Sequence, residues 1–348
     1  MNRKIFTLMA GALMLGMSSA SAMAAGKTIA VSWKTYQEER WKTDEAAIRA
    51  VVEAAGDKLV TTDAQLSAQK QAADIESLIS QKIDLIMVVA YDSDAILPSF
   101  KAASDAGVKM LSYDVLVEDP NALYVTFDNV GVGRLMAKTM LEKGKTEGNF
   151  AFIKGDKGDP NATFLFQGQM EVLKEGLDSG KIKNVCESFT DGWKPDNAQK
   201  NMEQCLTSTG NKVDAVMSEN DGMASGVVAA LDAQGLAGSV PVTGQDGDSA
   251  ALNRVALGTQ LVSVWKDSRA LGKVAAEAAV ALAEGADPAS IPGVVKFSGG
   301  AKGVEVNAIL LAPNPITKDN LNDVIDAGWV SKEVACAGVK AGTVAACN

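Results

Sequence analysis

Short apolar runs alternate with longer amphipathic segments along the chain from Thr28 onward. The runs are rich in Val, Ile and Leu, and the first amphipathic segment places Ile48, Val52 and Ala55 on one helical face, with Gly56 able to end the helix. This alternation predicts an α/β fold, in which helices cover both faces of a parallel sheet. Strands are expected at 28–32, 58–61, 85–89, 108–113, 123–127, 149–153, 182–186, 215–218, 240–243, 260–264 and 309–311, and a short helix from about residue 317.

The predicted strands fall into two series, one ending near residue 113 and the other beginning after 123–127. A chain of 348 residues is long enough for two domains at roughly 150 residues each. We therefore expect two similar lobes. No fixed period recurs along the sequence, which excludes solenoids and propellers.

The N-terminal segment has the pattern of a secretory signal. Arg3 and Lys4 precede an uncharged run, and small residues follow at Ala20-Ser21-Ala22 and Ala22-Met23-Ala24. The prediction is that residues 1–24 are a signal peptide and that the protein is exported to the periplasm. The alternative is an amphipathic or core helix at the N-terminus.

The composition excludes several classes of catalytic site and of binding partner. The chain has no histidine, which excludes Ser-His-Asp catalysis and histidine-ligated zinc and makes an enzyme improbable, although carboxylate chemistry stays open. A net charge of −10 disfavours nucleic acid as a partner. No metal or cofactor is expected, since Gly131-Val132-Gly133 lacks the third glycine of a dinucleotide fingerprint.

The four cysteines suit an exported chain with disulfides. Their spacing matches no C-x-x-C metal or redox pattern. Three pairings are possible, and we favour Cys186 with Cys205 and Cys336 with Cys347, because short loops keep each pair local.

Polar and aromatic residues follow the predicted strands. In open parallel sheets, ligands bind outside the carboxyl ends of the strands, so these residues are candidates for a binding site. Carboxylates, amides, Arg and Lys pair with sugar hydroxyls, and an indole covers the apolar face of a pyranose. The candidates are Glu39, Arg40, Trp41, Asp114, Asp159, Asn161, Trp193, Asn220, Asp246, Trp265 and Lys266.

The charges of this set balance, because Arg40 and Lys266 match Asp114 and Asp246, so a neutral ligand is favoured over a phosphate or a sugar acid. Each residue also has an ordinary structural explanation. Asp114, Asn220 and Asp246 could cap helices, Trp193 could be a core residue, and Arg40 and Lys266 could be solvated charges.

At these positions the chain resembles the periplasmic sugar-binding proteins of ABC importers, of the ribose and galactose type, and within that family most closely those that bind D-xylose. The resemblance covers roughly residues 26–333. It is carried by the segments Glu38-Glu39-Arg40-Trp41, Ser112-Tyr113-Asp114, Thr126-Phe127-Asp128-Asn129, Asn161-Ala162, Gly168-Gln169-Met170, Asp191-Gly192-Trp193, Ser218-Glu219-Asn220-Asp221, Gly244-Gln245-Asp246 and Trp265-Lys266.

The resemblance implies a type I periplasmic binding protein fold, with two Rossmann-like lobes joined by a hinge of three crossings near 127–129, 264–267 and 310–313. It divides the chain into a first lobe at 26–127 and 267–309, a second lobe at 128–266 and 310–333, and a cysteine-containing extension at 334–348. It also implies that Arg40, Trp41 and Asp114 meet a sugar from the first lobe and Asn161, Trp193, Asn220 and Asp246 from the second, with Lys266 at the hinge.

Two departures bear on the ligand. The members that bind D-xylose have an arginine where this chain has Val115, and an asparagine where it has Pro160. D-Xylose is therefore the first expectation, and another pentose, or a hexose such as D-glucose whose hydroxymethyl group fills the space of the guanidinium, is the alternative. The expected partner is a membrane permease, a chemoreceptor is the partner in an alternative or second role, and the binding protein itself is expected to be a monomer.

Two other classes of protein share parts of this pattern. A sugar-responsive repressor would need a basic helix-turn-helix before the first strand, where this chain has the predicted signal. A glycosidase could use Asp114 and Asp246 as its paired carboxylates.

Overall fold

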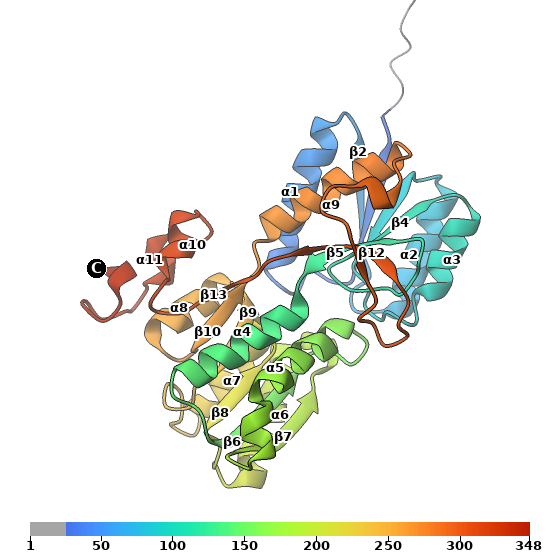
Figure 1. Ribbon diagram of the computed structural model, residues 1–348. Coiled ribbons are helices and arrows are strands. Elements are labelled where there is room, and N and C mark those ends of the chain that lie inside the picture. The colour runs from blue at the N-terminus through green and yellow to red at the C-terminus, as the bar shows by residue number, and fades with distance from the viewer. Residues whose placement is uncertain (1–25) are drawn as a thin grey trace, which may run out of the picture.

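The computed structural model describes residues 26–348, so the predicted signal peptide at 1–24 lies outside the described residues. The chain forms two lobes, each with mostly parallel strands between layers of helices, with one lobe above the other in Figure 1. The predicted α/β fold class is confirmed.

The first lobe is built on a seven-stranded sheet with the order β11-β12-β5-β4-β3-β1-β2, in which only β11 is antiparallel to its neighbour. Helices α1 and α9 pack together against this sheet, and α2 and α3 form a second pair. The bounds are β1 Thr28–Trp33, α1 Arg40–Ala54, β2 Lys58–Asp63, α2 Ala68–Ser80, β3 Leu85–Val88, α3 Leu97–Asp105, β4 Lys109–Tyr113, β5 Leu123–Phe127, α9 Ser268–Ala283, β11 Val295–Phe297 and β12 Val306–Leu311.

The second lobe contains two three-stranded sheets, β7-β6-β8 and β13-β10-β9. A parallel bridge between Val216 and Val242 joins them edge to edge. Helices α4 and α5 pack as one pair and α6 and α7 as another. The bounds are α4 Asn129–Glu142, β6 Gly148–Lys154, α5 Pro160–Asp178, β7 Ile182–Phe189, α6 Pro195–Thr209, β8 Ala215–Ser218, α7 Asp221–Asp232, β9 Thr243–Asp246, α8 Ser249–Leu257, β10 Val262–Trp265, β13 Asn314–Ile316, α10 Asn322–Asp326 and α11 Lys332–Ala335.

The chain passes between the lobes after β5, after β10 and after β12. Each passage is short, because α4 begins at Asn129, α9 begins at Ser268 and β13 begins at Asn314. Three short connections of this kind let two rigid lobes move relative to one another about a common hinge.

Several element bounds differ from the sequence prediction. The strand expected at 240–243 runs from Thr243 to Asp246 instead, because this polar segment is buried between β10 and α7, a tertiary environment that a hydrophobicity pattern does not report. The strand expected at 182–186 extends to Phe189, and the helix expected from 317 begins at Asn322. The short strands β11 and β13 were not predicted.

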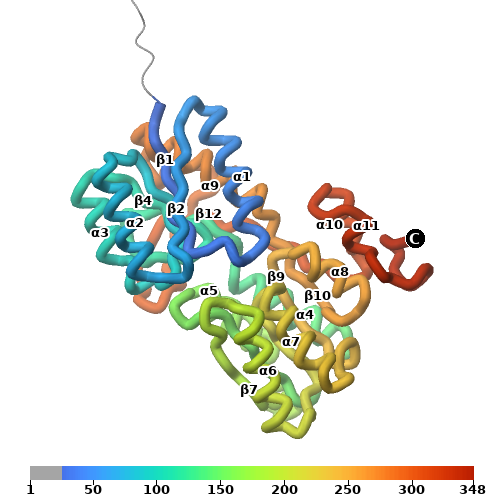
Figure 2. Tube along the Cα trace, turned by 180° about the vertical axis from the view of Figure 1, so that it is seen from behind, coloured from blue at the N-terminus to red at the C-terminus, as the bar shows by residue number. Residues whose placement is uncertain are grey.

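Each lobe has its own apolar core, and a smaller cluster joins α8 to the C-terminal module, which we define as residues 317–348. The predicted disulfide pairing is confirmed: Cys186–Cys205 links β7 to α6, and Cys336–Cys347 closes a loop in the module. Seen from behind in Figure 2, the module lies beside α8 and carries the C-terminus.

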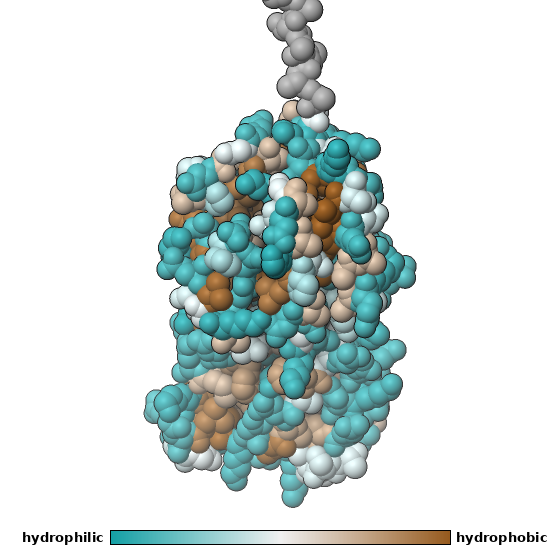
Figure 3. Space-filling model, turned by 90° about the vertical axis from the view of Figure 1, so that its right-hand side faces the viewer, coloured by the Kyte–Doolittle hydropathy of each residue, from teal (hydrophilic) through white to brown (hydrophobic). Residues whose placement is uncertain are grey.

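On the side of the molecule shown in Figure 3 the surface is largely hydrophilic, with separate apolar areas. Within residues 26–348, every helix is too short or too polar to cross a bilayer.

Candidate functional site

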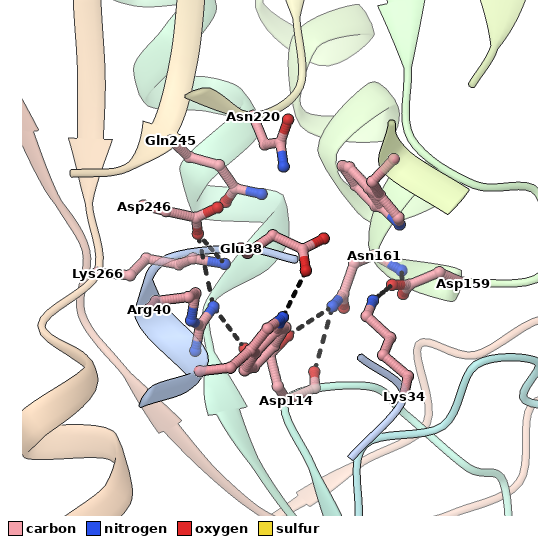
Figure 4. Close-up of a pocket in the computed structure, with 12 residues that line it drawn as sticks. Lys34, Glu38, Arg40, Asp114, Asp159, Asn161, Asn220, Gln245, Asp246 and Lys266 are labelled. Carbon is pink, nitrogen blue, oxygen red and sulfur yellow. Dashed lines mark hydrogen bonds and ion pairs between the residues drawn. The ribbon is translucent and has the colours of Figure 1, made fainter. Parts of the chain in front are cut away.

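A small cavity of about 20 Å³ lies between the lobes, at the carboxyl ends of the strands (Figure 4). With the lobes in contact this space has room for about one water molecule, so a larger ligand requires the lobes to separate. Twelve side chains line it: Lys34, Glu38, Arg40, Trp41 and Asp114 from the first lobe, Asp159, Asn161, Trp193, Asn220, Gln245 and Asp246 from the second, and Lys266 at a crossing.

Arg40 is the centre of charge in the cavity and is only 3% exposed. Its Nη1 lies 2.9 Å from an oxygen of Asp114 and 3.5 Å from Asp246 on the other lobe, and its Nε donates to Asp44 at 3.2 Å. Lys266 Nζ is 3.0 Å from the same oxygen of Asp246. The carboxylates of both lobes therefore share buried cations, which pair with them without an ionic ligand.

These cations also control protonation of Asp114. Burial by itself would raise the pKa of this carboxyl, but Arg40, Lys266 and Lys34 hold the pKa below its usual value. Asp114 therefore stays ionised and presents acceptor oxygens to the cavity. A glycosidase acid needs a carboxyl with a raised pKa, so Asp114 does not suit that role.

A second cross-lobe contact lies on the opposite side of the cavity. Lys34 Nζ is 2.9 Å from Oδ2 of Asp159, and both side chains are buried. Asn161 Nδ2 donates to the backbone oxygen of Asp114 at 3.3 Å and to its Oδ1 at 3.2 Å. The Asn161 side chain is oriented by Asn129, whose Nδ2 donates to its Oδ1 at 2.9 Å. The two lobes are thus in contact through polar groups that also face the cavity.

One indole ring from each lobe lines the cavity. Trp41 Nε1 donates to Glu38 at 2.5 Å, and the Arg40 guanidinium lies 4.5 Å from the Trp41 ring centroid. Trp193 lies in the turn Asp191–Trp193 that follows β7. Lys34 Nζ is 5.7 Å from the Trp41 ring and 5.8 Å from the Trp193 ring. Aromatic faces beside buried polar groups are suited to a ligand with both an apolar face and hydroxyl groups.

Three of the lining residues have an unfavourable backbone conformation. The φ angles of Asp114, Trp193 and Asp246 are +62°, +56° and +101°. L-residues with side chains rarely adopt positive φ, and such strain collects where a side chain must be aimed by the surrounding structure.

Several buried polar atoms that line the cavity have no hydrogen-bond partner within residues 26–348. These include the donors Arg40 Nη2 and Trp193 Nε1 and the acceptor Gln245 Oε1. An unpartnered buried polar atom costs free energy unless a ligand or solvent satisfies it. A ligand with several hydroxyl groups can do so, because each hydroxyl both donates and accepts.

The structure brings nine of the eleven candidates together around the cavity. Asn220 has two roles, because its Oδ1 caps α7 by accepting from Met223 N at 2.8 Å while the side chain also lines the cavity.

Glu39 and Trp265 do not line the cavity, and neither does Val115, the position that departs from the family pattern, which differs from the sequence prediction. Glu39 is exposed and contacts Ser249, since it precedes α1 on a different side from its neighbour Glu38. Val115 is 0% exposed and packs in the core of the first lobe. Trp265 packs against Trp329, at 5.7 Å between ring centroids.

Sequence reasoning missed three lining residues, namely Lys34, Glu38 and Gln245. Lys34 directly follows β1, so the strand-end rule that selected Asp114 could have found it. Gln245 lies within β9, and the polar sequence of this strand does not have the apolar pattern from which strands were predicted.

The amino-acid sequence is similar to those of several known proteins. Residues 29–287 match the periplasmic binding protein domain family. The D-xylose-binding periplasmic protein of Escherichia coli is 36% identical over 318 residues, which cover 91% of this chain and 94% of that protein. The multiple sugar-binding periplasmic receptor ChvE of Rhizobium radiobacter is 31% identical, with coverage of 93% and 96%.

Among solved structures, an ABC transporter solute-binding protein from Clostridium phytofermentans with bound β-D-glucose superposes with a TM-score of 0.78. It is 28% identical, and the match covers 89% of this chain and all of that one. The chain belongs to the periplasmic binding protein family. The resemblance to its sugar-binding members is confirmed.

Proposed function

We propose that this protein captures a neutral monosaccharide between its lobes and delivers it to the permease of an ABC importer. The observation that carries the proposal is the space between the lobes, in which unpartnered buried donors and acceptors lie beside two indole rings.

D-Xylose is the first candidate ligand. The support is the 36% identity to a D-xylose-binding protein over nearly the whole chain. The structure with β-D-glucose at 28% identity makes a hexose the alternative. The Val115 side chain is apolar and lies in the core of the first lobe, away from the cavity, so it contacts neither sugar.

Binding is coupled to lobe closure in this proposal. The pairs Arg40–Asp246 and Lys34–Asp159 each join one lobe to the other, so they exist only when the lobes are together. A sugar held between Trp41 and Trp193 adds contacts to both lobes and shifts the population toward the closed form, which is the form presented to a permease. No bond is made or broken.

Calorimetric titration of the sugar-stripped protein tests the proposal, with D-xylose, D-ribose, L-arabinose, D-glucose, D-galactose and sugar alcohols as the panel. Tryptophan fluorescence follows the indoles, and small-angle scattering follows closure as a fall in the radius of gyration. Saturable binding of one monosaccharide with a Kd of about micromolar or lower, accompanied by closure, is the expected result. Failure of every member of the panel to bind would overturn the proposal.

A further inference from the structure

The loop that carries Asp246 is held from two sides. Asp246 and Gly247 have consecutive positive φ angles, +101° and +77°. A non-glycine residue keeps such a conformation only where its surroundings enforce it. The neighbours of Gly247 therefore decide where the Asp246 carboxylate lies relative to Arg40 and Lys266.

Asp221 holds the loop on its inner side. This carboxylate is 1% exposed, and one of its oxygens accepts from the N–H groups of Gly247 and Asp248, each at 3.0 Å. Gln260 and Ser263 also donate to Asp221. These residues belong to the core of the second lobe, and Asp221 provides the acceptor for the two backbone N–H groups of the loop.

Trp329 holds the loop on its outer side. Its indole Nε1 donates to the carbonyl oxygen of Gly247 at 2.6 Å. The ring packs at 5.7 Å from the ring of Trp265, whose Cδ1 is 2.5 Å from the point where a β-carbon on Gly247 would lie. The two indole rings therefore pack against the loop and leave no room for a side chain at position 247.

Arg269, on α9 of the first lobe, holds Trp329 in place, and other contacts attach the rest of the C-terminal module. Arg269 lies 5.2 Å from the Trp329 ring and donates to Ala327 O at 3.0 Å. At the other end of the module, Asn253 on α8 donates to the carbonyl oxygens of Ala335 and Ala337. The apolar cluster and the Cys336–Cys347 disulfide complete the attachment.

We propose that Trp329 is a positioning residue for the ligand site: through its hydrogen bond to Gly247 it holds Asp246 in its strained conformation, so that this one side chain, and not the C-terminal module in general, braces the binding loop. This inference rests on the proposed function for its effect on affinity. The structural part, that Trp329 orders the loop, does not depend on which ligand is bound.

The variant Trp329→Phe tests this, because phenylalanine keeps the aromatic packing and removes the N–H donor. We expect the affinity for the sugar that binds the wild type to fall about three- to tenfold, the range for one hydrogen bond. In the sugar-free protein, hydrogen exchange measured by mass spectrometry should accelerate in a peptide covering residues 244–250.

Asn253→Ala is the matched control. It removes two hydrogen bonds that attach the same module and leaves the Trp329–Gly247 contact in place. We expect it to lower the melting temperature at least as much as Trp329→Phe while leaving the sugar affinity unchanged.

Wild-type affinity and unchanged exchange at 244–250 in Trp329→Phe would overturn the inference. Equal losses of affinity in the two variants would also overturn it, since general loosening of the module would then be the cause. If the wild type binds no sugar, the proposed function fails, and the exchange measurement still decides whether Trp329 orders the loop.

Discussion

The indole ring of Trp193 lies against the backbone of Gly155, so closely that a β-carbon at position 155 would be 2.1 Å from the ring. Gly155 follows β6, and its N–H donates to the buried carboxylate of Glu219 at 2.7 Å. The lack of a side chain at Gly155 therefore sets the position of the second-lobe indole in the cavity.

Gly155→Ala should weaken sugar binding by about tenfold or more, because the new methyl group must displace Trp193 from its place beside the ligand. Calorimetry measures the loss, and near-ultraviolet circular dichroism reports the indole. Gly222→Ala is the control, since its β-carbon would meet nothing closer than 3.7 Å. Unchanged affinity in Gly155→Ala would show that the indole position does not matter for binding.

Trp193→Ala and Asp246→Asn should each weaken sugar binding by at least about 1–3 kcal/mol, because one uncovers a sugar face and the other leaves Arg40 and Lys266 without their shared partner. Titration calorimetry of both variants checks this. Asp287→Asn changes a carboxylate that does not line the cavity and should bind as the wild type does. If both cavity variants fold and bind sugar with wild-type affinity, the cavity is not the sugar-binding site.

Glu39→Ala should lower the affinity for every sugar by the same small factor, about two- to fivefold. The Glu39 carboxylate accepts from N and Oγ of Ser249 on the opposite lobe, at 3.2 and 2.9 Å, and does not line the cavity. Its loss weakens the closed form without touching the ligand. The ratio of Kd values for two sugars is the measurement, and a changed ratio would contradict this assignment.

The stability of the protein should depend on pH through Asp44. Burial raises the pKa of this carboxyl to about 6, against the opposing effects of Arg40 and the Tyr113 hydroxyl. In the unfolded chain the pKa is about 4, so between about pH 4 and pH 6 the folded state binds a proton that the unfolded state lacks. This contribution to stability is fully present below about pH 4 and is lost as the pH rises through about 6.

Relative to Asp44→Asn, the free energy of unfolding of the wild type should therefore decrease by about 3 kcal/mol between about pH 4 and pH 7. Urea unfolding of both proteins across this range measures the difference. A difference that stays constant with pH, or that grows as the pH rises, would contradict the raised pKa of Asp44.

Much of the fold could be predicted from local patterns. Apolar runs such as Leu85–Val88 and Leu123–Phe127 are fully buried strands, and their alternation with amphipathic segments was enough to predict the α/β class. The disulfide pairing followed from short spacings. Most of the cavity residues could be selected because, in parallel sheets, polar residues after strands meet at one edge.

Other features of the fold and of the site depend on tertiary contacts that the local sequence pattern does not contain. Thr243–Asp246 is a strand only because β10 and the rest of the lobe bury it. Glu38 faces the cavity while its neighbour Glu39 contacts Ser249, a difference set by the direction of the chain at the start of α1 and by the position of the other lobe.

The sequence by itself therefore determined the fold class, the disulfide pairing and the edge where polar side chains gather, since these depend on periodicity and on short separations along the chain. Only the tertiary structure decided that Arg40 joins Asp114 to Asp246 and that Trp329 reaches Gly247. The members of each of these pairs are far apart in the chain, and the packing of the lobes and of the C-terminal module determines which of them meet.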